Sequence, residues 1–192
     1  MSQCIGVGCW VLTTDKKVVF VENAAWKGEQ ACRVDRPGGH AEPGECAGED
    51  ATKLSGAEVR RELFHCIQRE LRDEVNIGLE HQTAPELLGV VYNLERGGRL
   101  CENNIIISKS SLSTIYLLFS ALDFLIECDV DSETVRTLYN QGGSETDEST
   151  DLFFVDVEAI TGDKLEQSFV SRFTPHCAGS IHLLIHRLDQ SL

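Results

Sequence analysis

The sequence has few basic residues for its size. Lys and Arg together number 17 against 31 Asp and Glu, giving a formal net charge of −14. A surface that binds nucleic acid needs an excess of Lys and Arg to contact phosphates, so we expect no nucleic-acid partner. An acidic site can still bind a nucleotide if divalent cations lie between the carboxylates and the phosphates.

Long apolar runs are also absent. The most apolar segment, Ile115 to Ile126, is interrupted by Asp123 and is too short to span a bilayer. The N-terminus lacks the basic region and apolar stretch of a secretory signal. We therefore expect a cytoplasmic protein with no membrane partner.

No pair of cysteines shows the C-x-x-C spacing of a zinc or redox site. The cysteines are scattered and several stand in apolar runs, which favours reduced, buried thiols over a disulfide framework. They are Cys4, Cys9, Cys32, Cys46, Cys66, Cys101, Cys128 and Cys177. The chain of 192 residues is long enough for one domain, 1–192, and short for two.

The order of apolar patterns predicts an α+β fold. Runs at 5–12 and 18–21 flank a polar turn and predict a hairpin. Further strands are expected at 31–35, 87–94, 121–128 and 152–157, and helices at 57–76, 132–140 (with Ser132 as N-cap) and 178–188. Residues 37–39 are expected to form a sharp turn, and 42–56 and 141–150 to form loops. Strands and helices mix without strict alternation, so we expect a mixed sheet between helices, an α/β/α sandwich.

The helix at 57–76 places three acids on one face. At about 100° per residue, Asp73 and Glu74 lie to either side of Glu70. Such like charges repel, and acids near the end of a helix oppose its dipole. Divalent cations would remove this cost because they prefer oxygen ligands. The alternative is a solvated acidic face paired with Arg61, Arg69 and Arg72.

Residues before this helix favour a metal site. Gly39 and Glu45 are separated by five residues, and Arg69-Glu70-Leu71-Arg72-Asp73-Glu74 follows. Together they resemble the Nudix box, G-x5-E-x7-R-E-U-x-E-E-x-G-U, over about 38–78. Asn76 replaces the closing glycine and suits a left-handed helix end. The box expects seven residues between Glu45 and Arg69, whereas this chain has 23, an insertion at about 46–61 that holds a loop and extra helical turns.

An interrupted box of this kind resembles the UDP-glucose pyrophosphatase branch of the Nudix family. The resemblance extends to 34–40, to Glu148-Ser149-Thr150 and to the terminal helix around Gly179. It implies hydrolysis of UDP-glucose and UDP-galactose to UMP and a hexose 1-phosphate. In that branch a segment before the Nudix domain helps to form the nucleotide pocket, whereas Met1 here falls almost at the first expected strand. Residues 102–120 resemble an addition to the branch.

The resemblance also implies roles for individual residues. Glu70 and Glu74, with Asp73 directly or through water, would hold Mg²⁺ (Mn²⁺ is an alternative), and Arg69 would orient this acid cluster. Glu148 is the expected general base, with Glu145 as the second candidate. The residues expected to contact substrate are Asp35, Gly38, Gly39 and His40. The other histidines form no ligand pattern.

Two other functions remain open. One is a Nudix hydrolase for another nucleoside diphosphate derivative, such as ADP-ribose or a dinucleotide. The other is a catalytically weak domain that binds a nucleotide sugar without cutting it. The charge of −14 speaks against an RNA-cap hydrolase.

Overall fold

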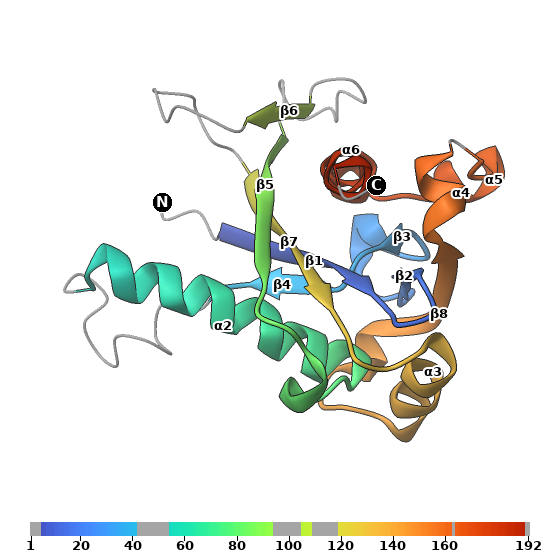
Figure 1. Ribbon diagram of the computed structural model, residues 1–192, viewed down its shortest axis with the longest axis horizontal. Coiled ribbons are helices and arrows are strands. Elements are labelled where there is room, and N and C mark those ends of the chain that lie inside the picture. Colours follow the sequence, from blue (N-terminus) through green and yellow to red (C-terminus); the bar gives the residue numbers. More distant parts are fainter. Residues whose placement is uncertain (1–4, 42–53, 94–104, 109–118, 163, 191–192) are drawn as a thin grey trace.

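A mixed sheet with helices on both faces forms the body of the molecule (Figure 1). The computed structural model describes residues 5–41, 54–93, 105–108, 119–162 and 164–190. Its strands are β1 Ile5–Leu12, β2 Lys17–Asn23, β3 Val34–Asp35, β4 Gly38–His40, β5 Glu86–Asn93, β6 Ile105–Ser108, β7 Phe119–Glu127 and β8 Ser149–Asp156. Its helices are α2 Gly56–Val75, α3 Ser132–Gln141, α4 Val157–Thr161, α5 Gln167–Val170 and α6 Pro175–Asp189, with short 3-10 turns η1 Gly28–Gln30, η3 Leu79–His81 and η4 Thr146–Glu148.

Strand β1 is the centre of the sheet. It pairs in parallel with β7 along its whole length. On its other side it pairs with β4 at one end and with β2 at the other end, both antiparallel. Strands β5 and β6 extend the sheet beyond β7, and β3 and β8 both pair with β2. One edge of β1 is therefore shared by two strands, with β4 at its N-terminal end and β2 at its C-terminal end.

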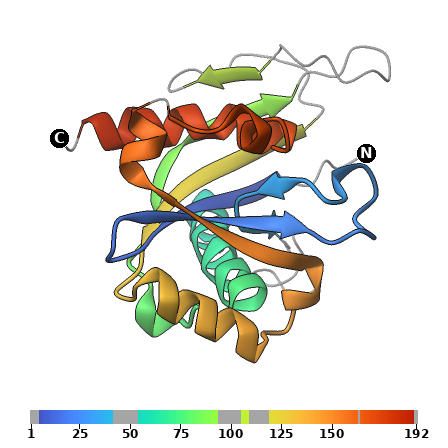
Figure 2. The ribbon, with the colours of Figure 1, turned by 90° about the vertical axis from the view of Figure 1, so that its right-hand side faces the viewer.

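Side chains of β1 alternate between two hydrophobic layers, as the period of a strand requires. Val7, Cys9 and Val11 pack with α2 and α3, whereas Trp10 and Leu12 pack with α4 and α6. Figure 2 shows α6 on one side of the sheet and α2 with α3 on the other. The predicted α/β/α arrangement is therefore confirmed.

The predicted acidic helix is confirmed as α2. Ser55 and Glu58 form a capping box at its start, and Ile67, Leu71 and Val75 are fully buried. The helix ends at Asn76, whose left-handed φ of 62° matches the expected helix end. Residues 56–61 supply the extra leading turns, whereas 42–53, with Glu45, lie outside the described residues.

Residues 37–39 were predicted to form a turn, and this was wrong. Gly38 and Gly39 lie in β4, which pairs with Gly6 to Gly8 of β1. The approach is close: a Cβ at Gly38 would lie 2.3 Å from the Val7 carbonyl oxygen. The glycines therefore allow the backbones of β4 and β1 to approach closely. A Gly-Gly pair in a sequence does not distinguish such a close approach from a turn.

Two further boundaries differ from the predictions. The strand expected at 31–35 is reduced to Val34–Asp35, because Cys32 adopts a left-handed φ of 58°. The N-cap of α3 is Asp131 and not Ser132, since the Asp131 carboxylate accepts from Thr134 N at 2.8 Å. The Ser132 hydroxyl donates instead to Asp15, at 2.7 Å.

The remaining elements follow the predicted order. Within the segment 102–120, Ile105–Ser108 pairs with β5, and 102–104 and 109–118 lie outside the described residues. The five cysteines in the described ranges are free thiols; Cys32 is exposed and the other four are buried. Among the described residues, no helix is long and apolar enough to cross a membrane.

Asn76 allows a test of how α2 ends. Its side-chain nitrogen donates to the Leu138 carbonyl at 2.7 Å, tying the end of α2 to α3. Asn76→Ala removes this bond and leaves a Cβ in the left-handed region, so we expect a loss of about 1–2 kcal/mol in the free energy of unfolding. Asn76→Gly removes only the bond and should cost less, as urea titration will measure. Equal losses would show that backbone conformation contributes nothing here.

Candidate active site

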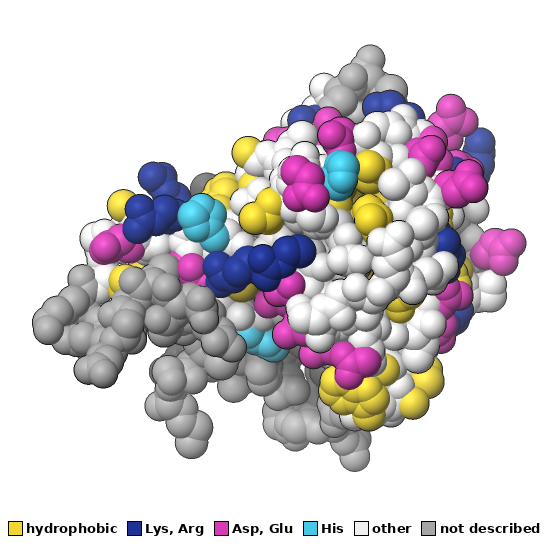
Figure 3. All heavy atoms as spheres, turned by 90° about the horizontal axis from the view of Figure 1, so that it is seen from below, with side chains coloured by type: hydrophobic (Ala, Val, Ile, Leu, Met, Phe, Trp, Pro, Cys, Tyr) yellow, Lys and Arg dark blue, Asp and Glu magenta, His cyan; other side chains and the backbone are white. Residues whose placement is uncertain are grey.

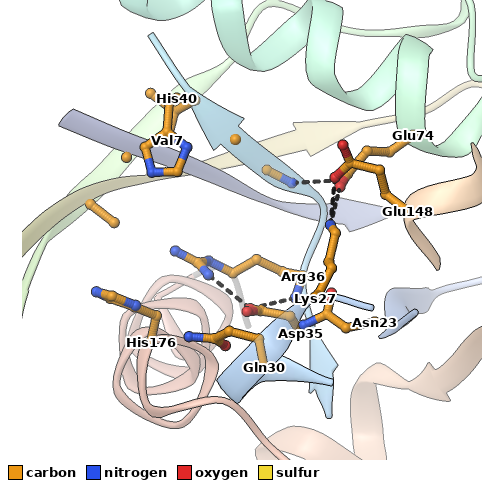
Figure 4. Close-up of a pocket in the computed structure, with 14 residues that line it drawn as sticks. Val7, Asn23, Lys27, Gln30, Asp35, Arg36, His40, Glu74, Glu148 and His176 are labelled. Atoms are coloured by element: carbon orange, nitrogen blue, oxygen red, sulfur yellow. Dashed lines mark hydrogen bonds and ion pairs between the residues drawn. The ribbon is translucent and has the colours of Figure 1, made fainter. Parts of the chain in front are cut away.

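A cavity of about 450 Å³ opens where β1, β4, α2 and α6 approach one another. Its walls come from seven parts of the chain: β1, the segment 23–30, the segment 35–40, the end of α2, Ala121 of β7, Glu148 of η4 and the start of α6. Figure 4 shows the side chains directed into it. Its lining includes Lys27, Asp35, Arg36, Gly38, Gly39, His40, Glu74, Glu148 and His176.

The acidic end of α2 packs directly on the glycines of β4. Gly38 N donates to Glu74 Oε2 at 2.9 Å. A Cβ at Gly39 would lie 2.3 Å from Glu70 Oε1, so a side chain there would displace that carboxylate. Gly38 therefore holds one of the predicted metal ligands by a hydrogen bond, and Gly39 leaves room for another.

Two carboxylates converge on one cation, and this cation is Lys27. Its ammonium nitrogen lies 2.6 Å from Glu148 Oε2 and 3.6 Å from Glu74 Oε1 (Figure 4). Glu74 comes from α2 and Glu148 from the turn before β8, so the fold brings together residues 74 positions apart, by their numbers. The predicted general base and a predicted metal ligand thus lie in one place.

The carboxyl groups of Glu70 and Glu74 have raised pKa values, chiefly because they are buried. Burial raises the pKa of Glu74 to about 8, against the opposing effects of Lys27 and of the Gly38 hydrogen bond. Burial also raises the pKa of Glu70 to about 7, with further contributions from the negative charges of Glu145, Glu148 and Asp73. A cation placed among these groups would stabilise their charged forms.

The donor set suits a divalent cation of the Mg²⁺ type. Carboxylate oxygens are the ligands that such hard ions prefer, and Glu74 and Glu148 already approach a common positive charge. In the described ranges, no three His, Cys, Asp or Glu side chains are gathered as a ready-made metal cluster. The carboxylates of Glu70, Glu74 and Glu148 are the residues of this site that could hold such an ion.

Asp73 and Arg69 form ion pairs with other residues of α2 and not with Lys27. Asp73 is bound by Arg72 through two hydrogen bonds of 2.7 and 2.9 Å. Arg69 forms an ion pair with Glu62, seven residues earlier on α2. The Arg72–Asp73 pair is of the kind that the alternative of a solvated face predicted, whereas Arg69 pairs with an acid outside the cluster, and Glu70 and Glu74 face β4.

The opposite end of the cavity is lined by a buried ionic network and by two histidines. Arg36 pairs with Asp123, which is fully buried, and with Asp35 at 2.9 Å. Asp35 also accepts from the Thr174 hydroxyl at 2.7 Å, so both of its carboxylate oxygens have protein partners. Asp35, predicted to contact substrate, therefore also fixes Arg36 and the start of α6.

His40 and His176 lie at this end, away from Glu74 and Glu148 (Figure 4). His40, which was predicted to contact substrate, is exposed at the end of β4. His176 Nε2 is buried and has no hydrogen-bond partner among the described residues. Burial lowers the pKa of His176, as does the positive charge of Arg36, so its imidazole is neutral at pH 7.

Sequence reasoning missed three residues of this cavity: Lys27, Arg36 and His176. Lys27 stands in an irregular loop with no motif around it. Arg36 adjoins Asp35, and an acidic–basic pair before a glycine pair was an available indication. His176 was set aside because the histidines form no sequence pattern, and it reaches the cavity only because α6 packs against β3 and the sheet.

The chain is similar in sequence to named proteins. The chain is 32% identical over 187 residues to a Mus musculus protein named uridine diphosphate glucose pyrophosphatase NUDT22, covering 95% of this chain and 54% of that protein. It is 32% identical over 194 residues to the Homo sapiens protein of the same name, covering 100% of this chain and 57% of the relative. The chain thus spans little more than half the length of these relatives.

Solved structures resemble the fold. A Nudix hydrolase from Nitrosomonas europaea matches with a TM-score of 0.54 at 15% identity, covering 97% of this chain and 90% of the other. A mutT/nudix family protein from Listeria innocua matches with a TM-score of 0.53 at 9% identity, covering 100% and 97%. At these identities the similarity concerns the fold alone. No family model matches the chain.

The raised carboxyl pKa values predict how stability depends on pH. Folded Glu70 and Glu74 bind protons more tightly than the unfolded chain, so their stabilising contribution is complete below about pH 4.5 and is lost as pH rises through about 7 to 8. In EDTA, we expect the free energy of unfolding to fall between pH 5 and 9, and Glu74→Gln to flatten this fall. Urea titration at several pH values measures it.

Glu158→Gln is the matched control, since Glu158 is an exposed glutamate of α4 outside the cavity. It should leave the slope of stability against pH unchanged. A parent protein whose stability rises steadily from pH 5 to 9 would contradict the raised pKa values.

Gly39 tests the contact between β4 and the acidic helix. Gly39→Ala should leave the protein folded, because the Glu70 carboxylate can move, yet Mn²⁺ affinity should fall about tenfold, as when support of a metal ligand is lost. Gly56→Ala is the control, because nothing lies within 4 Å of a Cβ there. Electron paramagnetic resonance of free Mn²⁺ measures both. Identical affinities in the two variants would refute the role of Gly39.

The mixed sheet between helices agrees with the similarity to the solved structures. The chain is therefore similar in sequence to uridine diphosphate glucose pyrophosphatases named NUDT22 and has the fold of solved Nudix hydrolases.

Proposed function

We propose that this chain hydrolyses the diphosphate linkage of a UDP-sugar, UDP-glucose or UDP-galactose, to UMP and a hexose 1-phosphate. The reaction would depend on Mg²⁺, with Mn²⁺ as a possible substitute. The named relatives, which are uridine diphosphate glucose pyrophosphatases, supply the substrate class. The observation that carries the proposal is the convergence of Glu74 and Glu148 on one positive charge at the wall of the cavity.

The cavity divides in a way that suits such a substrate. One end holds the carboxylates and Lys27, and the other holds Arg36, His40 and His176 (Figure 4). A diphosphate bound through cations at the acidic end would leave a sugar or nucleoside at the other. There the neutral imidazole of His176 can exchange hydrogen bonds with hydroxyl groups.

The chain's own residues would divide the chemistry between them. A bound Mg²⁺ would neutralise phosphate charge and lower the pKa of the attacking water. Glu70 and Glu74 would hold the cation, with Gly38 orienting Glu74 by a backbone hydrogen bond and Asp73 contributing through water. Glu148 would accept the proton of the water, and Arg69 would keep the central part of α2 in place through Glu62.

One observation favours the alternative of a domain that binds a nucleotide sugar without cutting it. The Lys27 ammonium already occupies the space between Glu74 and Glu148, and the described residues offer no assembled three-group cluster. The net charge of −14, with acidic and basic side chains lying beside one another on the face in Figure 3, supports a small-molecule ligand over RNA.

A single substrate panel separates these functions. The purified protein is incubated with UDP-glucose, ADP-ribose or NADH in the presence of Mg²⁺, and release of UMP or AMP is measured. We expect UMP from UDP-glucose, and a rate at least roughly a hundredfold lower for Glu74→Gln, which keeps the size of the side chain and loses its charge.

Each outcome has a meaning. AMP release without UMP would show that the substrate is another nucleoside diphosphate derivative. No turnover of any substrate would reject the proposal that the protein is an enzyme. Equal activity in Glu74→Gln would reject this site. Glu158→Gln, outside the cavity, controls for a general effect of removing one acidic charge.

A further inference from the structure

The loop that carries Lys27 is tied to the segment that carries Glu148. Ala24 N donates to the Glu148 carbonyl at 2.9 Å, and Lys27 N donates to the Ala24 carbonyl at 3.1 Å. Gly28 follows with a left-handed φ of 61°, which turns the chain into η1. The backbone thus holds Lys27 at a fixed place beside the acids, even though its side chain is long.

The Lys27 ammonium occupies the space between two acids rather than pairing with one. It is 2.6 Å from Glu148 and 3.6 Å from Glu74, whose side chain is almost fully buried. Only 20% of the Lys27 side chain is exposed, although lysine is rarely held inside a protein. A single charge therefore stands where two carboxylates from distant elements meet.

A monovalent ammonium and a divalent cation cannot share this position. A divalent cation held by Glu70 and Glu74 would take Glu74 from Lys27 and repel its ammonium, while the backbone of Lys27 would stay tied beside the cavity. Its flexible four-carbon stem lets the ammonium turn toward the cavity, where a diphosphate brings new negative charge. Lysine commonly binds phosphate as such a point charge.

We propose that Lys27 is a phosphate-binding residue that moves from Glu74 and Glu148 to the diphosphate of the substrate when Glu70 and Glu74 bind a divalent cation. The proposal rests on the proposed function for its substrate. It assigns Lys27 two roles that a structural ion pair lacks: competition with the metal in the absence of nucleotide, and attraction of phosphate in its presence.

Binding measurements test both roles without turnover. Lys27→Met keeps the stem and removes the charge, and Lys27→Arg keeps the charge. Lys164→Met is the control, because Lys164 lines a different surface depression beside α4. Mn²⁺ binding is measured without phosphate, and binding of inorganic pyrophosphate is measured at saturating Mn²⁺, both by calorimetry. Thermal unfolding checks that each variant is folded.

Lys27→Met should bind Mn²⁺ several-fold more tightly than the parent and should bind pyrophosphate at least about tenfold more weakly, the scale of one lost charge-assisted contact. Lys27→Arg should retain most of the pyrophosphate affinity, and Lys164→Met should match the parent in both. Unchanged or weaker Mn²⁺ binding by Lys27→Met, or unchanged pyrophosphate binding, overturns the proposal.

Kinetics then separate this proposal from the proposed function. If the parent cleaves UDP-glucose, Lys27→Met should raise KM more than it lowers kcat, because phosphate contacts are present in the bound substrate. If the parent cleaves no nucleotide, the proposed function fails, whereas the two binding measurements still decide the role of Lys27.

Discussion

The contact between the end of α2 and the glycines of β4 is the constraint on which the site depends. Gly38 donates its backbone hydrogen to Glu74, and Gly39 leaves room for Glu70. Because β4 is itself paired with β1, the acids are positioned by the centre of the sheet rather than by a loop. Sites built on paired strands and helices hold their geometry more closely than sites built on loops.

Burying the acids at this contact costs free energy, and hydrophobic packing of α2 offsets that cost. Buried, mutually repelling carboxylates favour their protonated forms, as the raised pKa values of Glu70 and Glu74 indicate. Ile67, Leu71 and Val75 bury the adjacent face of the same helix, and the capping box stabilises its start. Hydrophobic burial thus keeps in place an arrangement of charges that would not persist alone.

Much of the fold could be predicted because local rules and the final structure agree. The helical spacing of Ile67, Leu71 and Val75 appears as the buried face of α2, and Asn76 ends it in the left-handed conformation. The errors arose where a residue's role depends on a distant partner. Gly38 was expected in a turn because nothing local shows that it pairs with Gly8, 30 residues earlier by number.

By itself the sequence determined the elements and the acid face, because helical and strand periods, caps and the spacing of Glu70, Asp73 and Glu74 are local properties. Only the tertiary structure decided which charges meet. It placed Glu148 beside Glu74, put Lys27 between them, and brought His176 and Arg36 to the other end of the cavity. These neighbours come from separate elements. They meet because β4 pairs with β1 and because α2 and α6 pack on the two faces of the sheet.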